Sequence, residues 1–175
     1  MLAALVLAQA PIRIGPPDPV LPPTDPATSV ALFERLCARP FPDPAAIETA
    51  IAAEPGFAHW QPSGELEAMV PGRFWQSAAA TVRYNADPAS ARGLPSPQCT
   101  VRANAGATVV PDAVFAAVAG RLTLGQAKVS GRGRYRTAMW DSVHAGQRWR
   151  VLAGTERAGD RLELRLTIMN LGAER

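Results

Sequence analysis

Strict alternation of apolar and polar residues near the C-terminus constrains the fold more than any other feature of this sequence. Between residues 161 and 169, large apolar side chains occupy every second position, namely Leu162, Leu164, Leu166 and Ile168. Successive side chains of a strand point to opposite faces of a sheet, so this spacing predicts a strand with one buried face and one hydrated face. The end of the chain is therefore expected to be β-structure.

Two further segments, 131–140 and 147–155, are interpreted as strands with the same period. Short turn-forming stretches around 141–146 and 157–160 separate the three strands, which predicts a β-meander. We assign the following side chains to its buried face: Trp149, Val151 and Ala153 in the middle strand, and Tyr135, Thr137 and Met139 in the first. Trp140 and the arginines of the first strand are then expected on the opposite face.

Asp-Pro pairs mark the starts of two helices in the first third of the chain. An aspartate followed by proline suits the N-cap and the first position of a helix, and such pairs stand at residues 25–26 and 43–44. The second helix is expected to end at the Pro-Gly pair 55–56, which gives a helical hairpin. A third helix is expected to start at 111–112 and to close within 120–125.

Short segments rich in aromatic and β-branched residues predict further strands at 57–60, 73–76, 81–85 and 99–103. A long proline-containing loop is expected at 85–98, and a loop of that length is either mobile or functional. The expected fold class is α+β: an antiparallel sheet ending in a three-stranded meander, with an N-terminal helical hairpin and one further helix packed on one face.

The N-terminal region predicts export followed by a tether. Residues 1–10 are apolar and uncharged and end in Ala-Gln-Ala, a pattern typical of signal peptidase sites, although a buried N-terminal strand or helix is the alternative. Seven of the 17 prolines lie within 11–26, which we interpret as an extended linker. A single α+β domain is expected over 27–175. No transmembrane segment is expected, and the predicted location is periplasmic or secreted.

Cys37 and Cys99 are the two cysteines of the chain. Cys37 lies on the apolar side of the first predicted helix and Cys99 on the inward side of a predicted strand. Two cysteines in an exported chain are typical of one disulfide, which would support a core diluted by alanine. Two separate buried thiols are the alternative.

Positive charge gathers in the C-terminal part of the chain. Residues 1–110 carry seven arginines against nine acidic residues, whereas 111–175 carry eleven basic residues against six acidic ones. We predict that neighbouring strands present one arginine-rich contact face, made of Arg132, Arg134, Arg136, Arg148 and Arg150 with Trp140 beside them. Such a face would bind an acidic protein, a lipid headgroup or a polyanion. A solvated outer face is the alternative, and specific nucleic-acid binding is not expected.

Motifs for catalysis or for cofactors are not found. Asp141, Ser142 and His144 lie too close together in one predicted turn to act as a catalytic triad, whose members come from separate parts of a chain. The two histidines and the cysteines match no zinc or calcium ligand spacing, and no P-loop or dinucleotide-binding motif occurs. We therefore assign no catalytic residue, no metal and no cofactor.

Several short stretches carry a family resemblance: 31–37 (ALFERLC), 43–46 (DPAA), Phe74-Trp75 and 99–101 (CTV). With the closing strands, they resemble a family of small uncharacterised bacterial exported proteins and lipoproteins over about residues 30–170. The resemblance implies export and a single domain of this architecture, and it implies no activity. This chain has no cysteine after its apolar N-terminal run and so departs from the lipidated members.

The sequence as a whole favours an exported, non-enzymatic binding or accessory domain that uses the arginine-rich face. Two alternatives remain open. One is an enzyme that acts on an anionic substrate in a cleft between the 85–98 loop and the sheet. The other is a structural component of the cell envelope, held by the proline tether.

Overall fold

The structure is a computed structural model that describes residues 21–60, 72–86, 97–144 and 146–173. The predicted signal peptide, most of the predicted linker and most of the 85–98 loop lie outside these residues. The elements are α1 (Pro26–Phe33), the π-helical turn η1 (Glu34–Ala38), α2 (Pro44–Ala53), β1 (Ala58–His59), β2 (Arg73–Gln76), β3 (Ala80–Asn85), β4 (Gln98–Asn104), α4 (Pro111–Arg121), β5 (Lys128–Ser130), β6 (Tyr135–His144), β7 (Gln147–Ala158) and β8 (Arg161–Ala173).

Within the described residues, eight strands form one antiparallel sheet in the order β1-β2-β3-β4-β8-β7-β6-β5. Each half of the sheet follows a helix in the chain and consists of four consecutive strands. The last strands of the two halves, β4 and β8, pair in the middle. The predicted α+β class and the C-terminal meander are confirmed.

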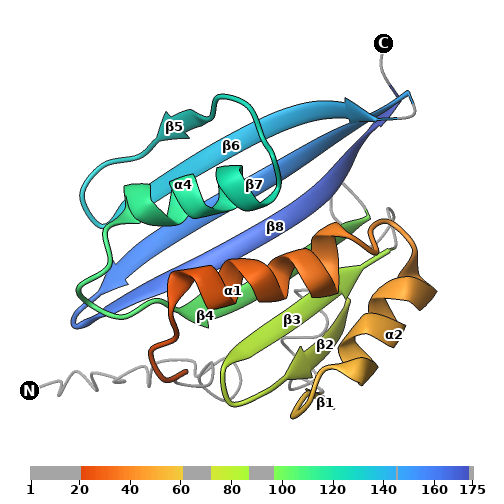
Figure 1. The fold of residues 1–175 in the computed structure, drawn as a ribbon, viewed down its shortest axis with the longest axis horizontal. Helices are drawn as coiled ribbons and strands as arrows, with labels where there is room; N and C mark the ends of the chain where they lie inside the picture. Colours follow the sequence, from red (N-terminus) through yellow and green to blue (C-terminus); the bar gives the residue numbers. More distant parts are fainter. Residues whose placement is uncertain (1–20, 61–71, 87–96, 145, 174–175) are drawn as a thin grey trace, which may run out of the picture.

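The helices cover one face of the sheet, which we call the helix face; the opposite face is the far face. Figure 1 shows α1 and α4 beside each other across the middle of the sheet, with α2 near β2 and β3. Tyr84 of β3 donates a hydrogen bond of 2.9 Å to the carbonyl of Pro42, just before α2. The core between these layers is built from Val30, Phe33, Leu36, Ile47, Ile51, Val82, Val101, Val114, Val118, Leu164 and Leu166, none more than 1% exposed.

The aspartates predicted as N-caps have that role in the structure. Asp25 accepts a hydrogen bond from the Thr28 amide, and Asp43 accepts from the amides at the start of α2. Pro26 and Pro44 occupy the first turns, where a missing N–H has no cost. α4 also begins with proline, but Val110 caps it without a side-chain hydrogen bond.

The predicted disulfide is confirmed. Cys37 of η1 and Cys99 of β4 are bonded, with their Cα atoms 5.5 Å apart, and both residues are fully buried. The bond ties the first helical segment to the middle of the sheet. None of the described helices is long and apolar enough to cross a membrane.

The predicted faces are confirmed for β7 and β8 but wrong for β6. Trp140 is opposite Val151 and Ala138 is opposite Ala153, and residues directly opposite one another share a face. Ala138 and Trp140 are therefore buried, whereas Tyr135 is 53% exposed on the far face. The register with β7, which the period of β6 alone cannot reveal, decides which set of residues faces inward.

The boundaries of the first predicted meander strand are also corrected. The strand expected at 131–140 begins at Tyr135 and continues to His144, because residues 131–134 form the turn after β5. Gly131 and Gly133 adopt φ values of 88° and 60° in this turn, a region that glycine enters without steric cost. A Cβ on Gly131 would collide with the carbonyl oxygen of Tyr135.

Candidate anion-binding site

The structure divides the predicted arginine face into two groups. Arg136 lies on the helix face, where its guanidinium is 2.7 Å from Asp112 of α4. Arg148 and Arg150 of β7 point to the far face, since they alternate with the inward-facing Trp149 and Val151. The prediction of a single face with five guanidinium groups is therefore wrong.

Trp140 does not line a contact surface either. Its side chain faces the helices and is only 4% exposed, so the ring belongs to the core. Arg150 is held by Asp141, directly opposite on β6, through two hydrogen bonds of 2.6 and 2.9 Å. The hydrogen bond from Arg150 is the main reason why the pKa of Asp141 lies below its usual value.

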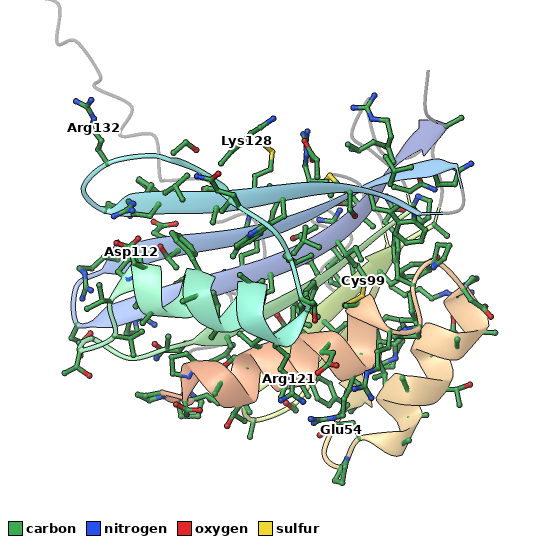
Figure 2. The ribbon with its side chains drawn as sticks, turned by 45° about the horizontal axis from the view of Figure 1, so that its top comes forward. Glu54, Cys99, Asp112, Arg121, Lys128 and Arg132 are labelled. Carbon is green, nitrogen blue, oxygen red and sulfur yellow. A yellow bond between two sulfur atoms is a disulfide. The ribbon has the colours of Figure 1, made fainter. Side chains whose placement is uncertain are left out.

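The first group of arginines lines a hollow of about 380 Å³ at one end of the helix face. We call it the arginine pocket, and it is lined by Pro111, Gly131, Arg132, Gly133, Arg134, Arg136, Arg157 and Leu162. It lies where α4 begins, β6 starts and β7 ends. Figure 2 shows Asp112, in the first turn of α4, at the same end of the molecule as Arg132. The pocket brings together three predicted arginines and Arg157, which the sequence reasoning missed.

The four arginines of the pocket are held in different ways. Arg136 pairs with Asp112, and its guanidinium lies over the ring of Phe115 at 6.0 Å. Arg134 pairs with Glu156 at 2.6 Å. The hydrogen bond between them is the main reason why the pKa of Glu156 is lowered and the pKa of Arg134 is raised. Two of the four cations thus have a carboxylate partner.

The other two arginines have none within the described residues. Arg157 donates hydrogen bonds of 2.7 and 3.2 Å to the carbonyl oxygens of Ala107 and Val109. The side chain of Arg132, exposed on the turn, has no hydrogen bond or ion pair to any residue in the described part of the chain. The pocket therefore carries an excess of positive charge, and its guanidinium groups offer paired N–H donors that match carboxylates and phosphates.

A buried acidic residue, Glu34, forms a second cluster with two arginines. Its side chain is 11% exposed and accepts hydrogen bonds from Arg39, at 2.7 and 3.0 Å, and from Arg121. Burial is the largest influence on the pKa of Glu34 and raises it, but the two arginines together outweigh burial and lower the pKa. Both carboxylate oxygens are occupied, so Glu34 joins η1 to the end of α4 rather than acting as a general base.

Asp141 and Ser142, two of the three residues rejected as a catalytic triad, lie on opposite faces of β6. Asp141 pairs with Arg150 on the far face, whereas the next residue, Ser142, is opposite Trp149 on the helix face. The side chain of His144 lies outside the described part. Within the residues that the structure describes, no group of three or more His, Cys, Asp or Glu side chains is placed to hold a metal ion.

Comparison with known proteins found no match among family models, curated proteins or solved structures.

Proposed function

We propose that this chain is an exported, non-enzymatic binding domain whose arginine pocket holds an anionic group of its partner. The observation that carries the proposal is that Arg132, Arg134, Arg136 and Arg157 line one hollow in which, within the described residues, two carboxylates pair with two of the four. Like charges that line one hollow repel each other, and a bound anion relieves the repulsion. The start of α4 at Pro111 adds a further positive potential.

Export is supported by the disulfide. A buried bond between Cys37 and Cys99 is typical of proteins that fold in an oxidising compartment, because cytosolic reductants keep thiols free. The apolar residues 1–10 and the proline-rich segment 11–26 fit a signal peptide and a tether, which gives a periplasmic or secreted location. The resemblance of residues 30–170 to small bacterial exported proteins favours the same conclusion.

The lining of the arginine pocket favours binding over catalysis. Its described residues supply guanidinium groups, glycine backbone and the apolar side chains of Pro111 and Leu162. A guanidinium stays protonated at neutral pH, so these groups bind and orient an anion but do not exchange protons with it. A polyanion or an acidic protein surface suits such a site, because each arginine contacts a separate anionic group.

Affinity for immobilised heparin, a polyanion probe, tests the proposal. The full chain is expected to be retained at physiological salt and to elute as salt rises. We expect Arg132→Gln to weaken binding by about fivefold to tenfold, the effect of losing one charge-assisted contact. The matched control is Arg148→Gln, since the side chain of Arg148 is also exposed and also has no hydrogen bond to a described residue, but lies on the far face.

The control substitution Arg148→Gln should change the affinity for heparin by less than about twofold. Equal losses in both variants would show that net charge alone drives retention. Elution of the unsubstituted chain at or below physiological salt would overturn the proposal.

A further inference from the structure

The far face carries a second hollow, of about 300 Å³, over β4, β8, β7 and β6. The register of the strands arranges its side chains in three parallel rows that run across the sheet. Reading from β4 to β6, the rows are Thr100–Thr167–Leu152–Met139, Arg102–Arg165–Gly154–Thr137 and Asn104–Glu163–Glu156–Tyr135. We call this hollow the far-face groove. It shares only Arg136 with the described lining of the arginine pocket.

Two arginines are directly opposite each other in the middle row. Arg102 of β4 pairs in register with Arg165 of β8, and like charges in that position destabilise a sheet. Glu163 lies 3.2 Å from Arg102 and offsets one charge. The side chain of Arg165 is exposed and makes no hydrogen bond or ion pair with the described part of the chain. Glu156, in the same groove, is close enough for the charge of Arg165 to help lower its pKa, but its hydrogen bond goes to Arg134, so the Arg165 guanidinium keeps its N–H donors unused among the described residues.

A third arginine adds to the positive charge at this place. Arg83 of β3 is opposite Thr100, so it lies on the same face, one row from Arg102. Burial, followed by the charge of Arg165, lowers the pKa of Arg83. Its Nε atom is buried and has no hydrogen-bond partner among the residues that the structure describes. Three guanidinium groups therefore lie on adjacent strands around the Thr100–Thr167 hydroxyl pair, whose oxygens are 2.9 Å apart.

The residue next to Arg165 in the middle row is Gly154, which has no side chain and so leaves space at the base of the groove. Its backbone does not require glycine: φ is not positive, and a Cβ there would make ordinary contacts, 3.8 Å from the Arg165 carbonyl oxygen. Glycine inside a strand weakens the sheet and often marks the close approach of a ligand. Along β7, Leu152 and Glu156 flank Gly154 on this face, and Tyr135 is opposite Glu156, so a flat group on Gly154 has Leu152 on one side and the Tyr135 ring with the Glu156 carboxylate on the other.

We propose that the far-face groove binds a small organic anion, with its carboxylate or phosphate group on Arg165 and Arg102 and its flat body on Gly154 between Leu152 and Tyr135. The size of the groove suits a small ligand rather than a macromolecule. The arginines favour an anionic ligand. The space above Gly154, beside apolar side chains, favours a ligand that also carries a flat apolar group. This site is additional to the arginine pocket, so either proposal can fail without the other.

Isothermal titration of the full chain with three probes tests the site: 4-nitrobenzoate, 4-nitrophenyl phosphate and inorganic phosphate. We expect saturable binding of at least one aromatic anion, and inorganic phosphate to bind about tenfold more weakly because it lacks the flat body. The stronger of the two aromatic anions identifies the preferred anionic group. No saturable binding of either aromatic anion up to about 10 mM would overturn the proposal.

Three variants then locate the binding. Arg165→Gln removes the cation and Gly154→Leu fills the floor, and each is expected to weaken binding of the aromatic anion by at least about fivefold. Arg132→Gln, in the arginine pocket, should leave the affinity for the aromatic anion within about twofold of that of the unsubstituted chain. If Gly154→Leu does not fold, Arg165→Gln decides alone. Undiminished binding in Arg165→Gln would overturn the proposal, and a loss confined to Arg132→Gln would assign the anion to the arginine pocket instead.

Discussion

Glu34 shows how a single residue connects elements that are far apart in the sequence. The chain widens into a π-helical turn at this point, so the Arg39 amide donates to the Glu34 carbonyl at 2.9 Å, five residues back. The side chain of Arg39 also returns to the Glu34 carboxylate, and Arg121 reaches it from the end of α4. A buried carboxylate is tolerated when charged partners satisfy it, and here the two guanidinium groups do so.

Stability is expected to depend on pH through Glu34. Its pKa in the folded protein is lower than the usual 4.5, so its contribution to the free energy of unfolding is fully present above about pH 4.5 and is lost as pH falls through the lowered value. Glu34→Gln should reduce the free energy of unfolding by about 1–3 kcal/mol at pH 7, and by less at pH 3, where the unfolded chain already binds a proton at Glu34 and the contribution of the carboxylate is declining. Urea unfolding at both pH values measures this difference.

Glu54→Gln is the matched control for Glu34. Glu54 also pairs with an arginine, Arg35, but its side chain is 26% exposed, against 11% for Glu34, and it has one arginine partner instead of two. We expect a change below about 1 kcal/mol at either pH. The structural role assigned to Glu34 would be wrong if the two variants lost equal stability, or if the loss in Glu34→Gln were as large at pH 3 as at pH 7.

Among the elements, the turn between β5 and β6 sets the geometry of the arginine pocket. Gly131 and Gly133 both line the pocket and both have positive φ, so the turn places Arg132 between them. Tyr135 donates its amide to the Arg132 carbonyl at 3.3 Å, and Arg157 donates its own amide to Arg134 at 2.8 Å. These backbone bonds bring the start of β6 beside the end of β7, which is why the arginines of both strands meet.

The two glycines of this turn are expected to differ in their tolerance of a side chain. Gly133→Ala should reduce the free energy of unfolding by about 1 kcal/mol, because alanine is strained in a left-handed backbone conformation even where its Cβ meets no other atom. Gly131→Ala should reduce the free energy of unfolding by at least about 2 kcal/mol, because its Cβ would also collide with the Tyr135 carbonyl oxygen. Urea unfolding of both variants gives the comparison. Equal costs, or a greater cost for Gly133→Ala, would contradict the turn geometry.

In the molecule as a whole, the disulfide joins the helical layer to the centre of the sheet. Cys37 belongs to η1, and Cys99 belongs to β4, which pairs with β8 where the two halves of the sheet meet. The sequence separation of 62 residues makes the bond a strong constraint on the unfolded chain. Several buried positions of the core are small, including Ala80, Ala138 and Ala153, so the apolar contacts alone supply less stabilisation.

Loss of the disulfide is expected to lower the free energy of unfolding by about 4 kcal/mol in the chain-entropy model. The double variant Cys37→Ala/Cys99→Ala avoids new buried hydroxyl groups, and its urea midpoint is compared with that of the oxidised protein. The oxidised protein should show no free thiol in urea, and two after reduction. An unchanged midpoint in the double variant, or two thiols without reductant, would overturn the assignment.

The sequence by itself determined the periodic and covalent features of this protein. The inward faces of β7 and β8, the aspartate caps of α1 and α2 and the Cys37–Cys99 pair follow from local spacing and residue chemistry. These features depend on neighbours along the chain, or on a choice with few alternatives, so they could be predicted.

Only the tertiary structure decided which charged residues meet. In β6 both sets of alternating positions contain apolar residues, so the face could be assigned only once the register with β7 was known. Arg157 joins Arg132 because β7 ends where β6 begins, and Arg165 is opposite Arg102 because β8 pairs with β4. Such contacts link residues tens of positions apart, and they form when the strands pair and the helices bury one face of the sheet.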